Sequence, residues 1–335
     1  KQLSSLSLPD CNLSNSGATL LSSALASPLA SSLTLLNLEN NSLTHQGATA
    51  LGPSLRLLSQ LTCLDLSSND IGELGLETLF PPSLSSLRLN HVHSADGLPL
   101  FGEHLCALSA LKRLDLGSSP ILPEFLAKFA PNTALASLDL SGWSVQQPKL
   151  TETLADIFER SSSVSRLCLK NSGLRADDVR GLETVLRNST EALTDLDLGG
   201  NLLGKGGAAK LTAILKSCRR LATFDLSQNK IGVNGAASLG PVLPHLSALS
   251  QLQIGGNDLG HKGLDKLAVA LSRCRYLGHL DLSLNRLRDQ GASRLAEVLQ
   301  ECRVLQNLGL SANEIGPEGM QQLGEGLAER EREVG

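Results

Sequence analysis

The stretch Leu277–Leu299, LGHLDLSLNRLRDQGASRLAEVL, changes its apolar period partway along. Leu280 and Leu282 alternate with polar residues, which predicts a short strand with one buried face. From Gly291 onward the apolar residues recur at helical spacing, which predicts an amphipathic helix. We therefore expect the fold to be built from units of one strand followed by one helix.

The same unit recurs along the whole chain of 335 residues. Its first half follows the pattern L-x-x-L-x-L-x-x-N-x-L, and successive units start 23 to 30 residues apart. Neither half of a unit can bury its apolar face alone, so each unit is stable only when it stacks on its neighbours. The twelve units start at Leu3, Leu33, Leu61, Leu84, Leu111, Leu135, Val164, Leu193, Leu221, Leu249, Leu277 and Leu305.

Stacking of these units predicts an α/β solenoid of about 12 repeats with a horseshoe shape. The strands are expected to form a parallel sheet on the concave face, and the helices to cover the convex face, because helices are wider than the spacing between strands. An asparagine after most strands is expected to point inward, where its amide can bond the turn and the next repeat. These asparagines are Asn41, Asn69, Asn201, Asn229, Asn257, Asn285 and Asn313.

The middle of the chain departs from the pattern. Four consecutive repeats replace the inward asparagine by Val92, Ser119, Trp143 and Ser172. The same repeats replace the glycine that leads the helix by Leu98, Phe125, Lys149 and Asp178. We expect a single domain over residues 1–335, regular in 3–83 and 193–335 and irregular over about 84–192.

Composition narrows the function classes. The net charge of −4, from 29 basic and 33 acidic residues, gives no global field for nucleic acid or an anionic membrane. The start at Lys1 and the charged end suggest a fragment of a longer protein. An odd number of scattered cysteines predicts reduced, buried thiols and a cytoplasmic location. They are Cys11, Cys63, Cys106, Cys168, Cys218, Cys274 and Cys302.

Two groups of polar side chains are expected on the concave face. Six repeats place an aspartate at the same strand position, in an acidic stripe made of Asp65, Asp115, Asp139, Asp197, Asp225 and Asp281. Within the irregular repeats, cationic and polar residues gather at concave positions, and we expect them to contact a partner. This cluster consists of Arg88, Asn90, His91, Arg113, Arg166 and Lys170.

No catalytic residue, metal site or cofactor is predicted. Gly199–Gly206 imitates a phosphate-binding loop, but Gly206 stands where the metal-binding hydroxyl belongs. His91 and His93 lack a converging third ligand for zinc. No side chain can be assigned as a nucleophile together with a general base that would activate it. The single tryptophan, Trp143, is expected to point inward, so the concave face lacks aromatic anchors and a moderate contact is favoured over a very tight one.

The patterns L-x-x-L-x-L-x-x-N-x-L and G-A-x-x-L-x-x-x-L resemble ribonuclease-inhibitor-type leucine-rich repeats. The resemblance implies a non-enzymatic scaffold or sensor that binds a protein partner. Stretches such as Leu271–Leu277 look most like the repeats of nucleotide-binding immune receptors, in which such an array is the C-terminal region. Two alternatives stay open: a GTPase activator resembling the Ran GTPase-activating proteins, and an actin-regulatory scaffold of the CARMIL type.

Overall fold

The computed structural model describes residues 3–76, 79–92, 105, 107–119, 134–143, 154, 155, 157, 159, 163–188 and 190–334. Its strands have three residues each. They are β1 (Ser5–Ser7), β2 (Leu35–Asn37), β3 (Cys63–Asp65), β4 (Ser86–Arg88), β5 (Arg113–Asp115), β6 (Ser137–Asp139), β7 (Arg166–Cys168), β8 (Asp195–Asp197), β9 (Thr223–Asp225), β10 (Gln251–Gln253), β11 (His279–Asp281) and β12 (Asn307–Gly309).

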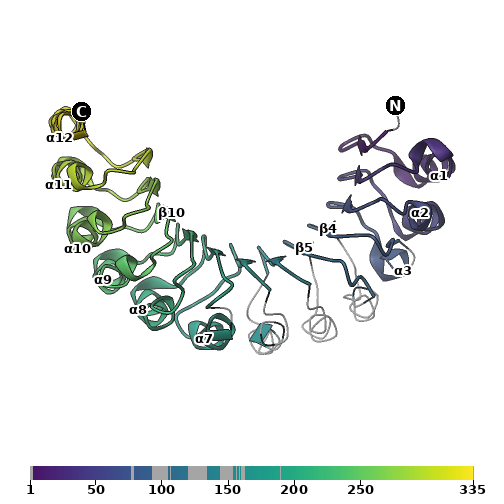
Figure 1. Ribbon diagram of the computed structural model, residues 1–335, viewed down its shortest axis with the longest axis horizontal. Coiled ribbons are helices and arrows are strands. Elements are labelled where there is room, and N and C mark those ends of the chain that lie inside the picture. The colour runs from purple at the N-terminus through teal and green to yellow at the C-terminus, as the bar shows by residue number, and fades with distance from the viewer. Residues whose placement is uncertain are drawn as a thin grey trace. The chain divides into compact units, whose positions relative to one another are not determined.

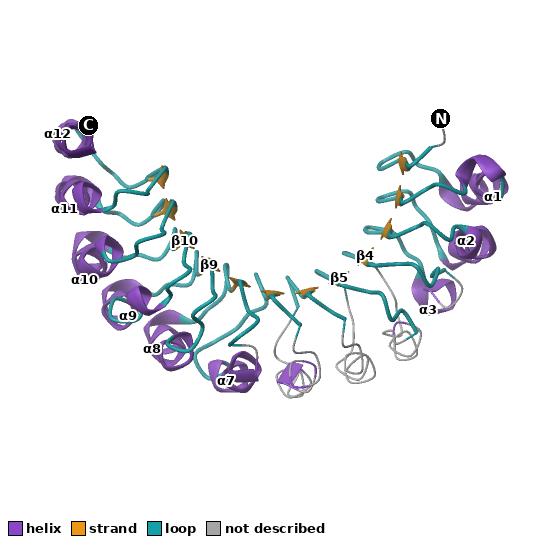
Figure 2. Cartoon of the chain, viewed as in Figure 1, coloured by secondary structure: helices purple, strands orange, loops and turns teal. Residues whose placement is uncertain are grey.

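Helices alternate with these strands along the described part of the chain (Figure 2). They are α1 (Ser14–Leu25), α2 (His45–Leu57), α3 (Gly72–Leu76), α7 (Val179–Asn188), α8 (Gly204–Leu215), α9 (Gly232–Leu239), α10 (Gly260–Ser272), α11 (Arg288–Glu301) and α12 (Pro317–Val334). Two short 3-10 helices, Pro28–Ala30 and Leu243–His245, complete them.

The strands are neighbours in chain order, from β1 to β12, in a parallel sheet. The contacts within the chain group into two compact units. The first unit comprises Lys1–Trp143 with Gln147–Leu167, and the second comprises Ser144–Gln146 with Cys168–Gly335. In the second unit, β8 to β12 lie on one side and α7 to α12 on the other (Figure 1). The alternation of twelve parallel strands with helices is confirmed, whereas a single domain stays a prediction.

The predicted change of period within each repeat is confirmed by burial. Leu280 in β11 and Leu282 just after it are buried, with exposed fractions of 2% and 0%. In α11 the buried face includes Gly291, Ala292 and Leu295. The core therefore lies between the strands and the helices, where leucines from adjacent repeats meet.

The predicted inward direction of the asparagines after the strands is also confirmed, and we call the row that they form the asparagine ladder. In Asn257 the side-chain oxygen accepts the backbone N–H groups of Asn229 and Ile231 in the preceding repeat, at 2.9 and 3.3 Å. Its amide nitrogen donates to three carbonyls, those of Leu226, Ile254 and Gly255. Asn257 is fully buried, and one side chain thus satisfies backbone groups of two repeats that would otherwise be unpaired.

Two of the irregular repeats keep the ladder with other donors. The Ser119 hydroxyl donates to the carbonyl of Leu89 at 2.5 Å and accepts the N–H of Val92 at 3.1 Å. The indole N–H of Trp143 donates to the carbonyl of Leu116 at 3.0 Å. The loss of asparagine is therefore not a loss of the inter-repeat bond at these positions. The replaced helix-leading residues Leu98, Phe125 and Lys149 lie outside the described residues.

We expect Asn257→Ala to lower the free energy of unfolding by at least about 2 kcal/mol, because two buried N–H groups lose their acceptor at roughly 1–3 kcal/mol each. Urea denaturation followed by circular dichroism measures this change. Asn234→Ala is the matched control, since Asn234 lies exposed on α9 of the same unit. Equal stabilities for the two variants would contradict the role given to the ladder.

Candidate functional site

Each strand presents its first and third side chains on what we call the strand face, and its second side chain to the core. In β10, Leu252 has an exposed fraction of 1%, while Gln251 and Gln253 on either side are half-buried. Strand register aligns the first and third residues of neighbouring strands into two rows, since Gln251 pairs with His279 and Gln253 with Asp281. Packing in the core therefore does not restrict which residues occupy the strand face.

The predicted acidic stripe occupies the third position of its strands and has a structural role. Each of the six aspartates uses Oδ1 to accept the backbone N–H two residues later, at distances from 2.7 to 3.4 Å. This bond fixes the turn that leaves the strand. Asp65 and Asp225 are buried, whereas the other four aspartates are partly exposed. The stripe is therefore a turn motif that also places some negative charge on the strand face.

In the first unit, the predicted cluster is partly neutralised by the stripe. Register places Arg88 between Asp65 on β3 and Asp115 on β5. The guanidinium of Arg88 pairs with the Asp65 carboxylate at 3.4 Å. Arg113, at the first position of β5, is exposed. Arg113 therefore lies in the row of first strand residues, apart from the row of third residues that holds the aspartates.

Asn90 and His91 belong to the turn after β4. The side-chain oxygen of Asn90 accepts the N–H of Gly117 at 2.7 Å, and its own N–H donates to the Ser67 hydroxyl at 3.2 Å. His91 adopts a φ of 51° and donates its N–H to the Gly117 carbonyl at 2.9 Å, with its ring exposed. Asn90 therefore serves the turn, while the His91 ring stays accessible.

The remaining two residues of the cluster lie elsewhere. Arg166 begins β7, within the first unit, and is exposed. Lys170 belongs to the second unit and is exposed, and its charge partly opposes the rise in the pKa of Asp197 that burial causes. The structure thus brings Arg88, Asn90 and Arg113 onto adjacent strands and turns. As a partner-binding surface, the whole cluster stays a prediction.

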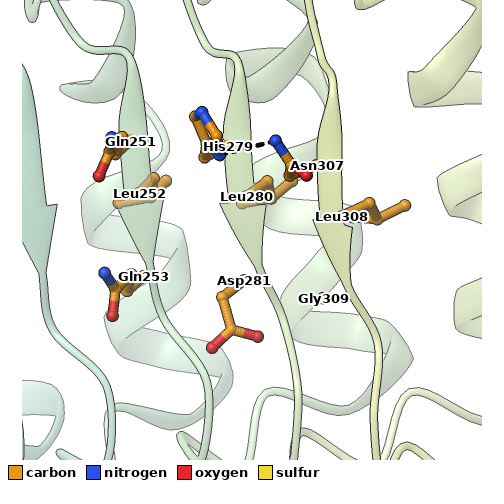
Figure 3. A pocket seen from close by; sticks show the side chains of 9 residues that line it. All are labelled: Gln251, Leu252, Gln253, His279, Leu280, Asp281, Asn307, Leu308 and Gly309. Atoms are coloured by element: carbon orange, nitrogen blue, oxygen red, sulfur yellow. Dashed lines mark hydrogen bonds between the residues drawn. The ribbon is translucent and has the colours of Figure 1, made fainter.

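Sequence reasoning missed a notch on the strand face of the second unit (Figure 3). The notch has a volume of about 390 Å³ and lies over β10, β11 and β12. Figure 3 shows its polar side chains on these three adjacent strands. The notch is lined by Gln251, Leu252, Gln253, His279, Leu280, Asp281, Asn307, Leu308 and Gly309.

A glycine at the third position of β12 makes room for the notch. A Cβ at Gly309 would lie 2.5 Å from Oδ1 of Asp281, so the carboxylate occupies space that a side chain would fill. The Asn307 amide nitrogen lies 2.9 Å from Nδ1 of His279, within hydrogen-bond distance, so the two side chains are held together at the rim of the notch. The signal in the sequence was Gly309 itself, at a position where β10 and β11 carry Gln253 and Asp281.

The charge of this face has one sign. Strands β8 to β12 carry four aspartates and neither lysine nor arginine; the aspartates are Asp195, Asp197, Asp225 and Asp281. Burial raises the pKa of Asp197 above its ordinary value, and the Asp225 carboxylate adds to this, while the bond from the Gly199 N–H and the Lys170 charge oppose it. The face is therefore suited to a cationic group, which would relieve the crowding of carboxylates.

The prediction of buried thiols is correct for three cysteines and wrong for Cys11. Burial raises the pKa of Cys274 to about 12 and that of Cys218 and Cys302 to about 11, which keeps these thiols protonated and unreactive near neutral pH. Cys11 is exposed because it takes the ladder position at the edge of the sheet. Cys63 and Cys168 are half-buried, none of the six described cysteines forms a disulfide, and Cys106 lies outside the described residues.

Within the residues that the structure describes, no three metal-binding side chains gather. His93, the partner considered for His91, lies outside them. None of the described helices combines the length and apolar character that a bilayer crossing requires.

Comparison with known proteins agrees with this geometry. A family profile described as Leucine Rich repeat matches residues 59–80, 217–240 and 273–296. The chain is a leucine-rich-repeat protein. An internalin from Listeria monocytogenes shares the fold with a TM-score of 0.53 at 19% identity, over 89% of this chain and 80% of that one.

The relatives with established names are distant. The ribonuclease inhibitor of Sus scrofa is 30% identical over 210 residues, which is 62% of this chain and 42% of the inhibitor. The NACHT, LRR and PYD domains-containing protein 14 of Homo sapiens is 31% identical over 229 residues, 64% of this chain and 20% of that protein. This leucine-rich-repeat chain thus spans less than half the length of either relative.

We expect Asp197→Asn to stabilise the second unit near pH 7. The raised pKa means that the folded state binds the proton more tightly than the unfolded chain, whose carboxyl titrates near 3.8. The stability contributed by Asp197 is therefore present below this value and is lost as pH rises through the folded pKa. The variant keeps the Oδ1 acceptor for the Gly199 N–H and removes the charge.

Urea denaturation of both proteins over a series of pH values measures the difference. The gain in the free energy of unfolding should be largest near neutral pH and should vanish below the titration of the unfolded carboxyl. If the variant were less stable than the wild type near neutral pH, the ionised Asp197 would instead be stabilised by its surroundings, and the prediction would be wrong.

Proposed function

We propose that this leucine-rich-repeat chain is a non-enzymatic scaffold whose strand face in the second unit binds a basic segment of a protein partner. The observation that carries the proposal is the notch over β10 to β12, set in a face whose strands β8 to β12 carry four aspartates and neither lysine nor arginine. Asp281 would receive a lysine or arginine side chain of the partner. The amides of Gln253 and Asn307 would then fix its orientation by hydrogen bonds.

The names of the relatives support a role in protein binding without catalysis. Two of them, from Sus scrofa and Mus musculus, bear the name ribonuclease inhibitor, which describes a protein that acts on another protein. The human relative has its leucine-rich repeats in a larger NACHT and PYD protein. We accordingly propose that this chain is a sensor region of a longer cytoplasmic protein of the immune-receptor kind, in which free thiols such as Cys274 are expected.

The GTPase activator is the rival function. A Dictyostelium discoideum relative named Rho GTPase-activating protein gacW is 27% identical over 200 residues, although the match covers 17% of that protein. Acceleration of GTP hydrolysis by Ran-type or Rho-type GTPases in the presence of the chain would favour this rival over a scaffold.

A photo-crosslinking amino acid at position 279 should capture a protein partner, because His279 lies exposed at the rim of the notch. The same amino acid at position 266 is the matched control, since Lys266 lies exposed on α10, on the helix side. Crosslinked species are detected by electrophoresis and identified by mass spectrometry. Capture from position 266 alone, or from neither position, would contradict binding through the strand face.

The partner identified in this way should bind the Asp281→Asn variant about tenfold more weakly, because a desolvated charge pair at an interface loses its carboxylate. Asn keeps the acceptor for the Ser283 N–H, so the turn is preserved. Isothermal titration calorimetry measures the affinity. An unchanged affinity would show that Asp281 does not contribute to the interface.

The predicted cluster on the first unit provides a second test. Where an acidic region of the same partner lies against this cluster, Arg113→Glu combined with Arg166→Glu should weaken binding about tenfold, because two glutamates would repel that region, and should not unfold the chain, because both side chains are exposed. Circular dichroism checks the fold and calorimetry the affinity. Wild-type affinity in the double variant would limit the interface to the second unit.

A further inference from the structure

A second surface of the second unit lies where each helix returns to the next strand. Strands β8 to β12 are in register at intervals of 28 residues, so the residues four and three positions before each strand are equivalent. We call the surface that they form the return edge. Its residue pairs are Glu191 and Ala192, Arg219 and Arg220, Ser247 and Ala248, Arg275 and Tyr276, and Arg303 and Val304.

The return edge rests on a rigid base. Backbone bonds connect one return to the next: the N–H of Ser250 donates to Ala222, that of Gly278 to Ser250 and that of Gln306 to Gly278, at 2.8 to 2.9 Å. Cys274 and Cys302 are buried beneath it. The side chains above are therefore held on a fixed spacing, at about 4.8 Å from one repeat to the next.

The arginines of the return edge are exposed and carry uncompensated charge. None of Arg219, Arg220, Arg275 and Arg303, nor Arg273 beside them, pairs with a carboxylate among the described residues. Arg220 donates to a backbone carbonyl, that of Glu191, at 3.2 Å.

Some arginines elsewhere in the same unit do pair with carboxylates. Arg286 pairs with Asp258 at 3.3 Å, and Arg288 pairs with Glu314 at 3.0 Å. The arginines of the return edge differ from these two in having no carboxylate partner among the described residues.

Apolar surface lies among these charges. Tyr276 has an exposed fraction of 66%, and Val304, the equivalent residue of the next repeat, has 43%. Tyrosine and arginine are the residue types that most often dominate binding energy at protein interfaces. The pair offers an apolar contact whose neighbours in sequence are Arg275 and Arg303.

This composition does not follow from the repeat. The equivalent positions of the first unit that the structure describes hold uncharged residues throughout. These positions are Ser31, Ser32, Ser59, Gln60, Pro82, Ser83, Ser109, Ala110, Ala134 and Ser163. A return can therefore be built from small polar residues, so folding does not require the positive charge of Arg219, Arg275 and Arg303.

We propose that the return edge of the second unit is a docking site for a short acidic segment of a protein that carries an apolar or aromatic residue. Guanidinium groups bind carboxylates through two parallel hydrogen bonds, which favours arginine over lysine for this purpose. The four returns from Arg219 to Arg303 span about 15 Å, the length of about five extended residues. The apolar residue of the segment packs on Tyr276 and Val304.

The length of the arginine run favours a peptide over a longer polyanion. Glu191 occupies the return that precedes Arg219, and Glu301 lies exposed beside Arg303 at the other end. Nucleic acid, with a charge at every nucleotide, would extend beyond both carboxylates. A bilayer surface would call for more inserted apolar side chains than Tyr276 and Val304 provide.

The direct test uses the fluorescein-labelled pentapeptide EEFEE and fluorescence anisotropy. The wild-type chain should bind it, and Arg275→Glu with Arg303→Glu should weaken binding at least about tenfold, as expected for reversal of paired interface charges. Tyr276→Ala should weaken it about fivefold through loss of the apolar contact. Lys262→Glu with Lys266→Glu, on exposed positions of α10 with the same change in net charge, should stay within about twofold of wild type.

Three results would overturn the proposal. One is absence of peptide binding, and another is equal weakening by the α10 control variant, which would reveal only a net-charge effect. The third is tighter binding of oligo(dT) or of phosphatidylserine vesicles than of the peptide, with loss in the Arg275→Glu, Arg303→Glu variant, which would assign the edge to nucleic acid or membrane. Asp281→Asn should leave peptide affinity unchanged, so this outcome is independent of the strand-face proposal.

Discussion

The pairing of backbone groups between stacked repeats is the constraint on which the structure depends. Each repeat turns from strand to helix in the protein interior, where N–H and C=O groups have no water to bond. A buried side chain must therefore carry both a donor and an acceptor at this point. Asn257 meets the requirement with one amide that serves two repeats, and Ser119 meets it with one hydroxyl.

This constraint divides the residues of a repeat into fixed and free positions. The leucines and the ladder residue are fixed by burial, and the third strand residue is tied by its carboxylate to the following turn, as Asp281 shows. The first strand residue and the return residues are less constrained, since the core does not use their side chains. Variation at His279 and Tyr276 therefore changes the surface without changing the fold.

The second unit presents two surfaces of opposite charge. Its strand face carries aspartates around a notch that Gly309 opens, and its return edge carries arginines around Tyr276. The return edge precedes the strands in each repeat, whereas the strand face is formed by the strand residues themselves. The two proposals together describe a scaffold that would bind a basic segment and an acidic one within the same unit.

The sequence by itself determined the repeat length, the parallel order of strands and helices, and the inward direction of Trp143, because burial imposes a period that is visible in the residues. Only the tertiary structure decided how the free positions combine. Register across strands set Arg88 between Asp65 and Asp115 and brought His279 to Asn307. These contacts join residues about one repeat apart, and no local pattern reports which side chains will meet across that distance.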